Sequence, residues 1–331
     1  MCLVSVTTFA QVAKDTTWKR SDFIADTDEY LSIKLDAHNT SDRIQLVGQN
    51  ALDIRPNTDV RNKLSVNYKW LTVGFSFRIP NMFGNGDNTK GETKTSGFNF
   101  GLNLDRWAVN FQYTKNVGHY LENSRQIDPM IEGNTYILFP DFTTFSYNFS
   151  VGYLTNTNFS LKSLTSLTER QLKSSGSFMP YARATYFKTQ HPEDGLIDLD
   201  RTNNYQAQLG VSYTHKFVLL KNFYVATSGS LGYGAFWYKT INDDLNQTNS
   251  GTSGVFGYHY GASTGYNGDR FFVGAIFNHI QNNYPQQNEI DFSTVRNNFE
   301  IFIGYRIRVP KFLRKPLNFV DDTKQKIINK P

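Results

Sequence analysis

The stretch Leu71-Thr-Val-Gly-Phe-Ser-Phe-Arg-Ile79 decides the fold, because its apolar and polar residues alternate without interruption. Every odd position is apolar, and every even position is small or polar. Successive side chains of a β-strand point to opposite faces, so this stretch predicts a strand with one apolar face and one polar face.

The same alternation recurs along much of the chain. Residues 98–105, 107–114 and 145–153 place aromatic or aliphatic side chains opposite mostly small or polar ones. Alternating segments of about ten residues are typical of transmembrane β-barrels, apolar toward lipid and polar toward the lumen. A soluble β-sandwich can also alternate, but residues 223–237 and 299–309 exceed globular strands of about five or six residues. We therefore predict an all-β, antiparallel up-and-down barrel in outer-membrane lipid, with a secreted glycan-binding β-protein as a weaker alternative.

The composition fits this class and excludes others. The 331 residues include 24 Gly, 27 Phe, 19 Tyr and 4 Trp, as expected for tight turns and aromatic girdles. No run of about eighteen apolar residues occurs, which excludes a membrane-spanning helix. The net charge of +5 is dispersed, so nucleic acid is not an expected partner. A single cysteine, Cys2, excludes a disulfide framework and a cysteine-based metal site, and we expect neither cofactor nor metal.

The two ends of the chain differ from the barrel segments. Residues 1–10 resemble the end of a signal peptide, with an apolar run and a small-residue cleavage site before Gln11. We therefore expect a natural start upstream and Sec export to the outer membrane of a Gram-negative bacterium; a lipid anchor on Cys2 is a minor alternative. Residues 11–28 are expected to form a periplasmic segment, followed by the barrel at 29–309. The basic tail, 310–331, is expected to be solvated and disordered, or else to contact a periplasmic protein or peptidoglycan.

The connections predict about twelve strands. Short connections at 69–70, 105–106, 219–222 and 267–269 alternate with long ones at 81–94, 117–141, 190–203, 242–253 and 282–294. Such barrels have short periplasmic turns and long outer loops, so both termini are expected in the periplasm. The structure of two segments is left undecided by the sequence. Residues 43–54 can form an extra strand or an outer loop. Residues 155–177 can form a periplasmic or lumen-inserted connection, a helix near 162–173, or two more strands that would give a count of fourteen. The predicted strands are 29–39, 60–69, 71–79, 96–105, 106–116, 143–155, 177–188, 204–217, 222–238, 255–267, 269–281 and 295–309.

Alternation also assigns charged side chains to the lumen. A narrow barrel can fill its lumen with internal ion pairs, whereas the same charges in a wider barrel set its ion preference. Both hypotheses require inward charge, so the sequence leaves them open. The candidates are Lys34, Asp36, Lys69, Arg78, Asp105, Arg183, Glu300, Arg306 and Arg308.

Five short motifs occur in a characteristic order: Arg55-Pro-Asn57, Tyr68-Lys-Trp-Leu71, Lys90-Gly-Glu-Thr93, Asn158-Phe-Ser160 and Arg170-Gln-Leu-Lys-Ser-Ser-Gly-Ser177. Together they resemble the Bacteroidota domain-of-unknown-function family four-four-two-one over about residues 29–309. An expected Lys-Ser-Ala-Gly-Ser reads Lys173-Ser-Ser-Gly-Ser177, and an expected Leu-Arg-Pro-Asn begins with Ile54. The resemblance implies an outer-membrane β-barrel of a Gram-negative envelope and brings no known activity. The motif candidates are Arg55, Pro56, Asn57, Arg170, Gln171, Lys173, Ser174, Gly176 and Ser177.

Catalytic constellations are sparse. Twelve-stranded outer-membrane phospholipases place a His two residues before a Ser on one strand, and none of the six histidines is followed by Ser at that spacing. His259 and Ser263 come closest, but four residues of strand separate them by about 13 Å. We therefore predict a non-enzymatic barrel, either a narrow pore for small polar solutes or a structural or partner-binding envelope protein. A barrel enzyme acting on lipid or surface polysaccharide is the alternative. Residues 170–177 are interpreted as a plug, a partner contact or a cap on the rim.

Overall fold

The computed structural model describes residues 19–47, 52–57, 60–77, 88–131, 133, 135–190, 201–242, 247–284 and 291–310. The expected leader at 1–10, nearly all of the tail at 310–331 and the lumen candidate Arg78 lie outside these residues. The described residues are mostly β-strand. None of their helices is long and apolar enough to cross a membrane.

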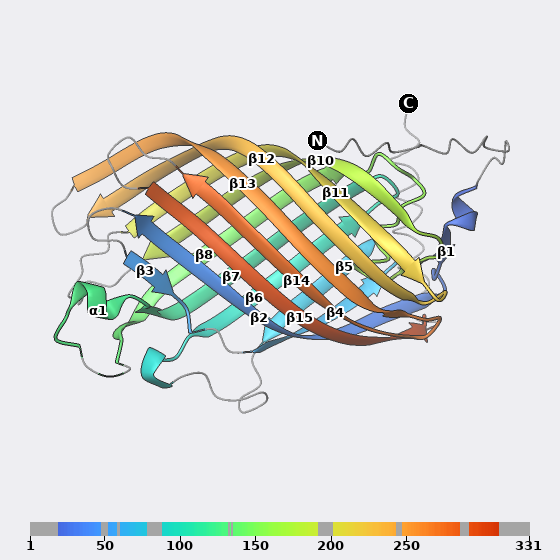
Figure 1. The fold of residues 1–331 in the computed structure, drawn as a ribbon, viewed down its shortest axis with the longest axis horizontal. Helices are drawn as coiled ribbons and strands as arrows, with labels where there is room; N and C mark the ends of the chain where they lie inside the picture. Colours follow the sequence, from blue (N-terminus) through green and yellow to red (C-terminus); the bar gives the residue numbers. More distant parts are fainter. Residues whose placement is uncertain are drawn as a thin grey trace, which may run out of the picture.

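Twelve strands form one closed antiparallel barrel (Figure 1). Each barrel strand pairs with the next barrel strand along the chain, and β15 pairs with β2 to close the ring. This confirms the predicted fold class and strand count, and the alternative of fourteen barrel strands is wrong. The barrel strands are β2 (Tyr30–Val47), β4 (Arg61–Tyr68), β5 (Leu71–Phe77), β6 (Lys94–Asn103), β7 (Trp107–Leu121), β8 (Ile137–Tyr153), β10 (Ser175–Gln190), β11 (Arg201–Leu219), β12 (Phe223–Asn242), β13 (Gln247–Asn267), β14 (Phe271–Tyr284) and β15 (Asp291–Arg308).

Three short strands lie outside this ring. β1 (Ile24–Asp26) and β9 (Glu169–Gln171) pair with each other, whereas β3 (Leu52–Arg55) pairs with both β2 and β7. The segment 43–54 therefore divides between the end of β2 and a four-residue strand. Residues 154–174 contain no helix, so a helix near 162–173 is wrong. The short helices of the described residues are η1 (Arg20–Asp22), η2 (Asn88–Lys90) and α1 (Ser124–Ile127).

The two ends of the barrel differ in construction. At the end that we call the turn end, tight connections join β4 to β5, β6 to β7, β11 to β12 and β13 to β14. Toward the opposite loop end, β4, β5 and β6 have only 7 to 10 residues, and β2 and β7 extend beyond them. β3 joins these extensions by pairing Ile54 with Ile44 of β2 and with Leu121 of β7. Ile54 and Leu121 pack there with Phe139 and Phe142 as a small apolar core.

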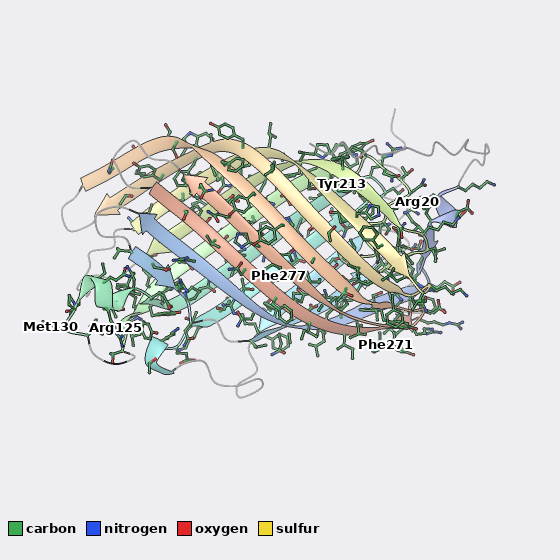
Figure 2. All side chains as sticks on the ribbon, viewed as in Figure 1. Arg20, Arg125, Met130, Tyr213, Phe271 and Phe277 are labelled. Atoms are coloured by element: carbon green, nitrogen blue, oxygen red, sulfur yellow. The ribbon has the colours of Figure 1, made fainter. Side chains whose placement is uncertain are left out.

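The outer face of the barrel is apolar. In β11, Leu209 is 72% exposed, whereas the preceding Gln208 points inward and is 3% exposed. Figure 2 labels Tyr213, Phe271 and Phe277, which are exposed on the same outer face. Soluble monomers rarely expose such a continuous apolar surface, whereas a lipid-facing barrel requires one, so the barrel is a membrane protein. Further exposed residues of this band are Leu64, Val66, Phe75, Phe149, Val211, Leu231, Tyr233, Phe256, Ile301 and Ile303.

Candidate functional site

The chain between β8 and β10 enters the barrel at the turn end, and we call residues 156–173 the plug segment. Ser32 of β2 donates a hydrogen bond to the Leu167 carbonyl at 3.3 Å, and Lys216 of β11 donates to the Ser163 carbonyl at 2.8 Å. All four residues are at most 1% exposed. Because four strands separate β2 from β11 around one side of the ring, these contacts span the lumen. Of the alternatives left open for 155–177, the structure has the lumen-inserted connection.

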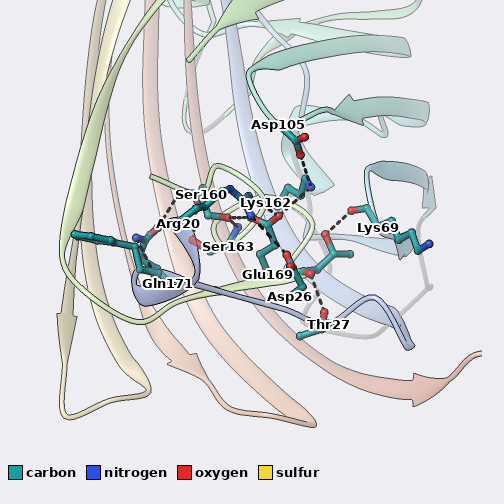
Figure 3. A network of polar contacts seen from close by, with 12 residues as sticks. Arg20, Asp26, Thr27, Lys69, Asp105, Ser160, Lys162, Ser163, Glu169 and Gln171 are labelled. Carbon is teal, nitrogen blue, oxygen red and sulfur yellow. Dashed lines mark hydrogen bonds and ion pairs between the residues drawn. The ribbon is translucent and has the colours of Figure 1, made fainter. Parts of the chain in front are cut away.

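Glu169 organises the plug segment from within (Figure 3). Its carboxylate accepts hydrogen bonds from the Ser160 hydroxyl at 2.5 Å and the Lys162 ammonium at 2.9 Å, and from the Arg20 guanidinium at 2.9 Å. Burial alone would raise the pKa of the Glu169 carboxyl, but the two cations and the Ser160 hydroxyl outweigh burial and hold this pKa below its usual value. Glu169 is therefore a buried charge whose partners compensate its lost hydration.

Arg306 of β15 attaches the tip of the plug segment to the wall. Its guanidinium donates to the Leu167 carbonyl from Nε at 3.0 Å and from Nη2 at 2.6 Å, and Nη2 also donates to the Asn267 side-chain oxygen at 2.6 Å. Leu167 lies in the left-handed region with φ of 55°, and its side chain packs against Phe272 and Phe302. Arg306 is fully buried. It therefore holds the plug rather than lining an open bore.

Arg170 connects the plug segment to two hairpin turns. Its Nη2 donates to the Asn222 side-chain oxygen at 2.6 Å, its Nε donates to the Asn267 carbonyl at 3.1 Å, and its Nη1 pairs with Asp269. The rest of this motif joins the plug segment to β10 and its neighbours. The Gln171 side chain accepts a hydrogen bond from the Ser160 backbone amide at 2.8 Å, and Lys173 lies 5.3 Å from the centre of the Phe23 ring. The Ser174 hydroxyl accepts from the Val218 backbone amide at 2.9 Å, and the Ser177 hydroxyl accepts from the Asn156 backbone amide at 3.1 Å. Gly176 leaves no room for a side chain beside His215.

The other motif, Arg55 to Asn57, lies at the loop end, so the structure does not bring the two motifs together. Arg55 donates to the Asp53 carboxylate at 2.9 and 2.8 Å. Pro56 is buried and lines a cavity of the lumen. Asn57 donates from its side chain to the Gly91 carbonyl at 2.6 Å. These contacts fix the connection after β3 against the segment that precedes β6.

Four of the wall's charged residues form a closed network near the turn end. Lys34 lies 2.7 Å from Glu300 and 2.8 Å from Asp36, and Lys63 lies 3.3 Å from Glu300 and 3.4 Å from Asp36. The two positive and two negative charges come from β2, β4 and β15 only. This arrangement corresponds to the predicted internal ion pairs rather than to a ring of free charge. Lys63 was not among the candidates, although the outward Leu64 and Val66 indicate that position 63 points inward.

Beyond the plug segment the lumen holds two polar chambers. The turn-side chamber, about 500 Å³, lies against Leu161 and Leu164 of the plug segment and against the network of charged residues. The loop-side chamber, about 250 Å³, is lined largely by Asn, Gln, Ser and Thr side chains. Asn110, Ser150 and Arg183 line both chambers, and we call these three residues the junction. The lumen is therefore a polar cavity that the plug segment bounds at the turn end.

Three predicted lumen residues are corrected by the structure. Lys69 lies in the turn between β4 and β5, where its carbonyl accepts a hydrogen bond from Thr168. The Asp105 side chain is 67% exposed in the next such turn, 3.9 Å from Lys162. Arg308 is exposed at the last position of β15. Alternation fails for these residues because strand pleating ends at the turns that hold Lys69 and Asp105 and at the end of β15, so a side chain there is no longer held toward the lumen.

Sequence reasoning named Arg306 and Arg170, but it missed Lys162, Glu169 and Lys216, which also form the plug contacts. Lys162 and Glu169 lie in an irregular segment with no periodicity, and only the adjacent Arg170 motif indicated that part of the chain. Lys216 could have been found, because alternation in β11 places even positions inward. It lies 3.9 Å from the centre of the Tyr224 ring and donates to the Ser163 hydroxyl at 3.1 Å.

The His–Ser pair that comes closest to the phospholipase spacing, His259 and Ser263, lines the lumen. His259 shares a hydrogen bond of 3.0 Å with the Asn278 side-chain oxygen, and its strand neighbour Ser263 lines the same turn-side chamber. Within the part of the chain that is described, no group of three or more His, Cys, Asp or Glu side chains could hold a metal ion.

Comparisons with known proteins identify one family model that matches most of this chain. A family model described as "Domain of unknown function (DUF4421)" matches residues 14–307. Among curated protein sequences, none matches this chain.

Three solved structures show the range of similar barrels. The outer membrane protease OmpT of Escherichia coli is 8% identical, with 86% of this chain and 98% of that chain covered at a TM-score of 0.38. The β domain of the Bordetella autotransporter BrkA is 13% identical, with coverages of 83% and 99% and a TM-score of 0.42. The toluene transporter TodX of Pseudomonas putida is 8% identical, with coverages of 85% and 90% and a TM-score of 0.30. No activity is transferred from these proteins.

Proposed function

The chain belongs to the DUF4421 family, a domain of unknown function, and we propose that it is a non-enzymatic outer-membrane barrel whose plug segment controls the passage of small polar solutes. Solutes enter the polar chambers from the loop end, and the plug segment stops them at the turn end. Under this proposal the turn end faces the periplasm of a Gram-negative bacterium, because such barrels turn tightly on that side. The basic tail would then extend toward periplasmic partners.

The observation that carries this proposal is the contrast between the two ends of the lumen. At the turn end, Leu167, Ser163 and Ser166 of the plug segment are at most 1% exposed. Toward the loop end, the chambers present amide and hydroxyl groups, and none of the residues that the structure describes fills them. A merely structural barrel of this width gains nothing from two polar cavities, because unfilled polar surface contributes no packing.

Excision of the plug segment tests the proposal. The Asn156 side-chain amide donates to the Ser175 hydroxyl at 3.2 Å and to the Gly176 carbonyl at 2.8 Å, so the residues on either side of the excised segment are already in contact. A short Asn-Gly turn can therefore replace residues 157–173 and close a β8–β10 hairpin. The variant retains every barrel strand.

Single-channel conductance in planar bilayers is the measurement. We expect the full-length barrel to conduct weakly or not at all, and the excised variant to conduct steadily. Arg106→Gln, which changes an exposed residue in the β6–β7 turn at the same end and outside the plug segment, is the matched control and should behave as the full-length chain. Heat-modifiable gel migration confirms that each barrel is folded. Equal conductance of the full-length and excised barrels, or a folded and inserted excised barrel that stays silent, would contradict the proposal.

A further inference from the structure

Arg183 differs from the other charged residues of the lumen. It projects from the inner face of β10 at the junction, where it is only partly buried. Among the described residues, no carboxylate lies within ion-pair distance of its guanidinium. Lys34 and Lys63 share Glu300 and Asp36, and the buried Arg306 is bound to backbone and side-chain oxygens of the plug and the turns.

The chamber linings carry an excess of positive charge. Five of the described residues that line the two chambers are Lys or Arg, and Glu300 is the one carboxylate among them. Glu300 and Asp36 balance Lys34 and Lys63, and Arg43 pairs with Asp53, whereas no such pair is formed by Arg183 with any described carboxylate. An unpaired cation inside a low-dielectric wall attracts anions more strongly than one at a surface. The electrostatic balance at the junction therefore favours a negatively charged group beside Arg183.

The position of Arg183 is fixed by the Tyr181 ring, which lies over two glycines. Its guanidinium lies 5.3 Å from the centre of the Tyr181 ring. The Tyr181 ring in turn crosses Gly210 of β11 and Gly232 of β12, where an added Cβ would come within 2.5 and 2.6 Å of the tyrosine. Any larger residue at either glycine would displace the ring. Stacking of this kind orients a planar guanidinium and leaves its N–H donors free to bind a ligand.

The groups around Arg183 are suited to hydroxyl-bearing ligands. Ser150 is its register partner on β8, and Asn110 follows on β7 in register with Ser150. Their amide and hydroxyl groups can donate and accept. The larger chamber, about 500 Å³, is in the usual range for small-molecule sites, about 300–1,000 Å³, and it shares the junction with the smaller chamber of about 250 Å³.

We propose that the junction binds a small solute that carries a carboxylate or phosphate group on a hydroxyl-rich body, with Arg183 as the anchor of the anionic group. This inference names the class of solute for the proposed function. It rests on that function only for the premise that solutes reach the junction from the loop end. A guanidinium binds either oxyanion through two parallel N–H donors, so the shared chemistry is the oxyanion. Asn110 and Ser150 contact the hydroxyl groups.

The test is calorimetric titration of the full-length barrel in detergent with three matched probes: glucuronate, glucose 6-phosphate and glucose. We expect at least one anionic probe to bind at least tenfold more tightly than glucose, as removal of a charge-assisted contact implies. Preference for glucuronate identifies the group as a carboxylate, and preference for glucose 6-phosphate identifies it as a phosphate. Equal binding of all three probes, or no binding of any at millimolar concentration, would overturn the proposal.

Variants locate the site. Arg183→Gln should weaken the preferred probe tenfold or more without changing the binding of glucose, whereas Arg183→Lys should retain part of the preference. Arg106→Gln removes an exposed cation that stacks on Tyr153 at the turn end, and it should leave binding unchanged. An Arg183→Gln barrel that binds the anionic probe as tightly as the original sinks the inference, and Arg183→Lys provides the test if Arg183→Gln does not fold. Binding does not require passage, so a silent excised barrel together with selective binding would refute only the proposed function.

Discussion

The replacement Glu169→Gln should loosen the plug segment by about 3 kcal/mol. Glutamine keeps the volume of the side chain and can still accept from Ser160, but it leaves the buried Lys162 ammonium with only the exposed Asp105 carboxylate, 3.9 Å away, as a counter-charge. Breaking a buried ion pair in this way costs about 3–5 kcal/mol. The Arg20 side chain is 35% exposed, so its lost contact adds less than about 1 kcal/mol. Retention of the Ser160 bond reduces the total, and about 3 kcal/mol corresponds to roughly a hundredfold shift in the opening equilibrium.

Hydrogen exchange measured by mass spectrometry can detect this shift directly, because amide exchange reports local opening. Peptides that cover residues 157–173 should exchange roughly a hundredfold faster in Glu169→Gln, whereas peptides from β11 and β12 should not change. Lys162→Met and the double variant complete a double-mutant cycle, in which the two replacements should be strongly non-additive. Exchange of the plug peptides within threefold of the original chain, or simple additivity in the cycle, would refute the assigned role of Glu169.

Two further predictions concern pH and the lipid face. Because the pKa of Glu169 is lowered from its usual value of 4.5 in the folded state, its contribution to stability is complete above pH 4.5 and is lost as the pH falls through the folded value. Exchange of the plug peptides, corrected for intrinsic rates, should therefore accelerate below pH 4.5 in the original chain, and a Glu169→Gln barrel with the same pH profile would argue against this residue as the cause. Leu209→Arg places a charge in the middle of β11 and should cost about 2–4 kcal/mol if that position faces the bilayer midplane, whereas Leu220→Arg in the exposed β11–β12 turn should cost little. Chemical unfolding in lipid vesicles measures both, and equal costs would contradict a lipid-facing position for Leu209.

The barrel wall was predictable because its determinants are local. In β4, the pattern of Leu64 and Val66 against Ser65 and Asn67 follows from alternation alone, and the exposed and buried side chains obey it. Membrane immersion on one side and a polar lumen on the other impose this period on every strand. The same rule identified Arg183 as an inward residue. Applied to the odd positions of β4 and the even positions of β11, it would also have added Lys63 and Lys216 to the lumen candidates.

Predictions failed where a contact joins segments that are distant along the chain. Ile24 of β1 pairs with Gln171 of β9, and neither three-residue strand is long enough to show a period. The path of the plug segment depends on Arg306 and Ser32, which meet at one carbonyl of Leu167. No pattern within residues 156–173 specifies those partners. The sequence therefore left plug, cap and partner contact open for this segment.

The division of polar contacts into separate groups has a consequence for selectivity. The wall network of Lys34, Asp36, Lys63 and Glu300 contains no plug residue, so it stays paired when the plug segment leaves. Glu169 and Lys162 belong to the plug segment and would remain together as it moves.

Lys216 and Arg306 behave differently, because the oxygens that they bind include neutral carbonyls of the plug segment. Departure of the plug leaves both cations short of acceptors and exposes them to the lumen, where water or an anion replaces the Ser163 and Leu167 carbonyls. An open barrel would therefore present Arg183, Lys216 and Arg306 along one pathway, while its wall carboxylates remain neutralised. Opening the plug and favouring anions would then be a single event, so the excised barrel should prefer anions more strongly than the closed chambers do.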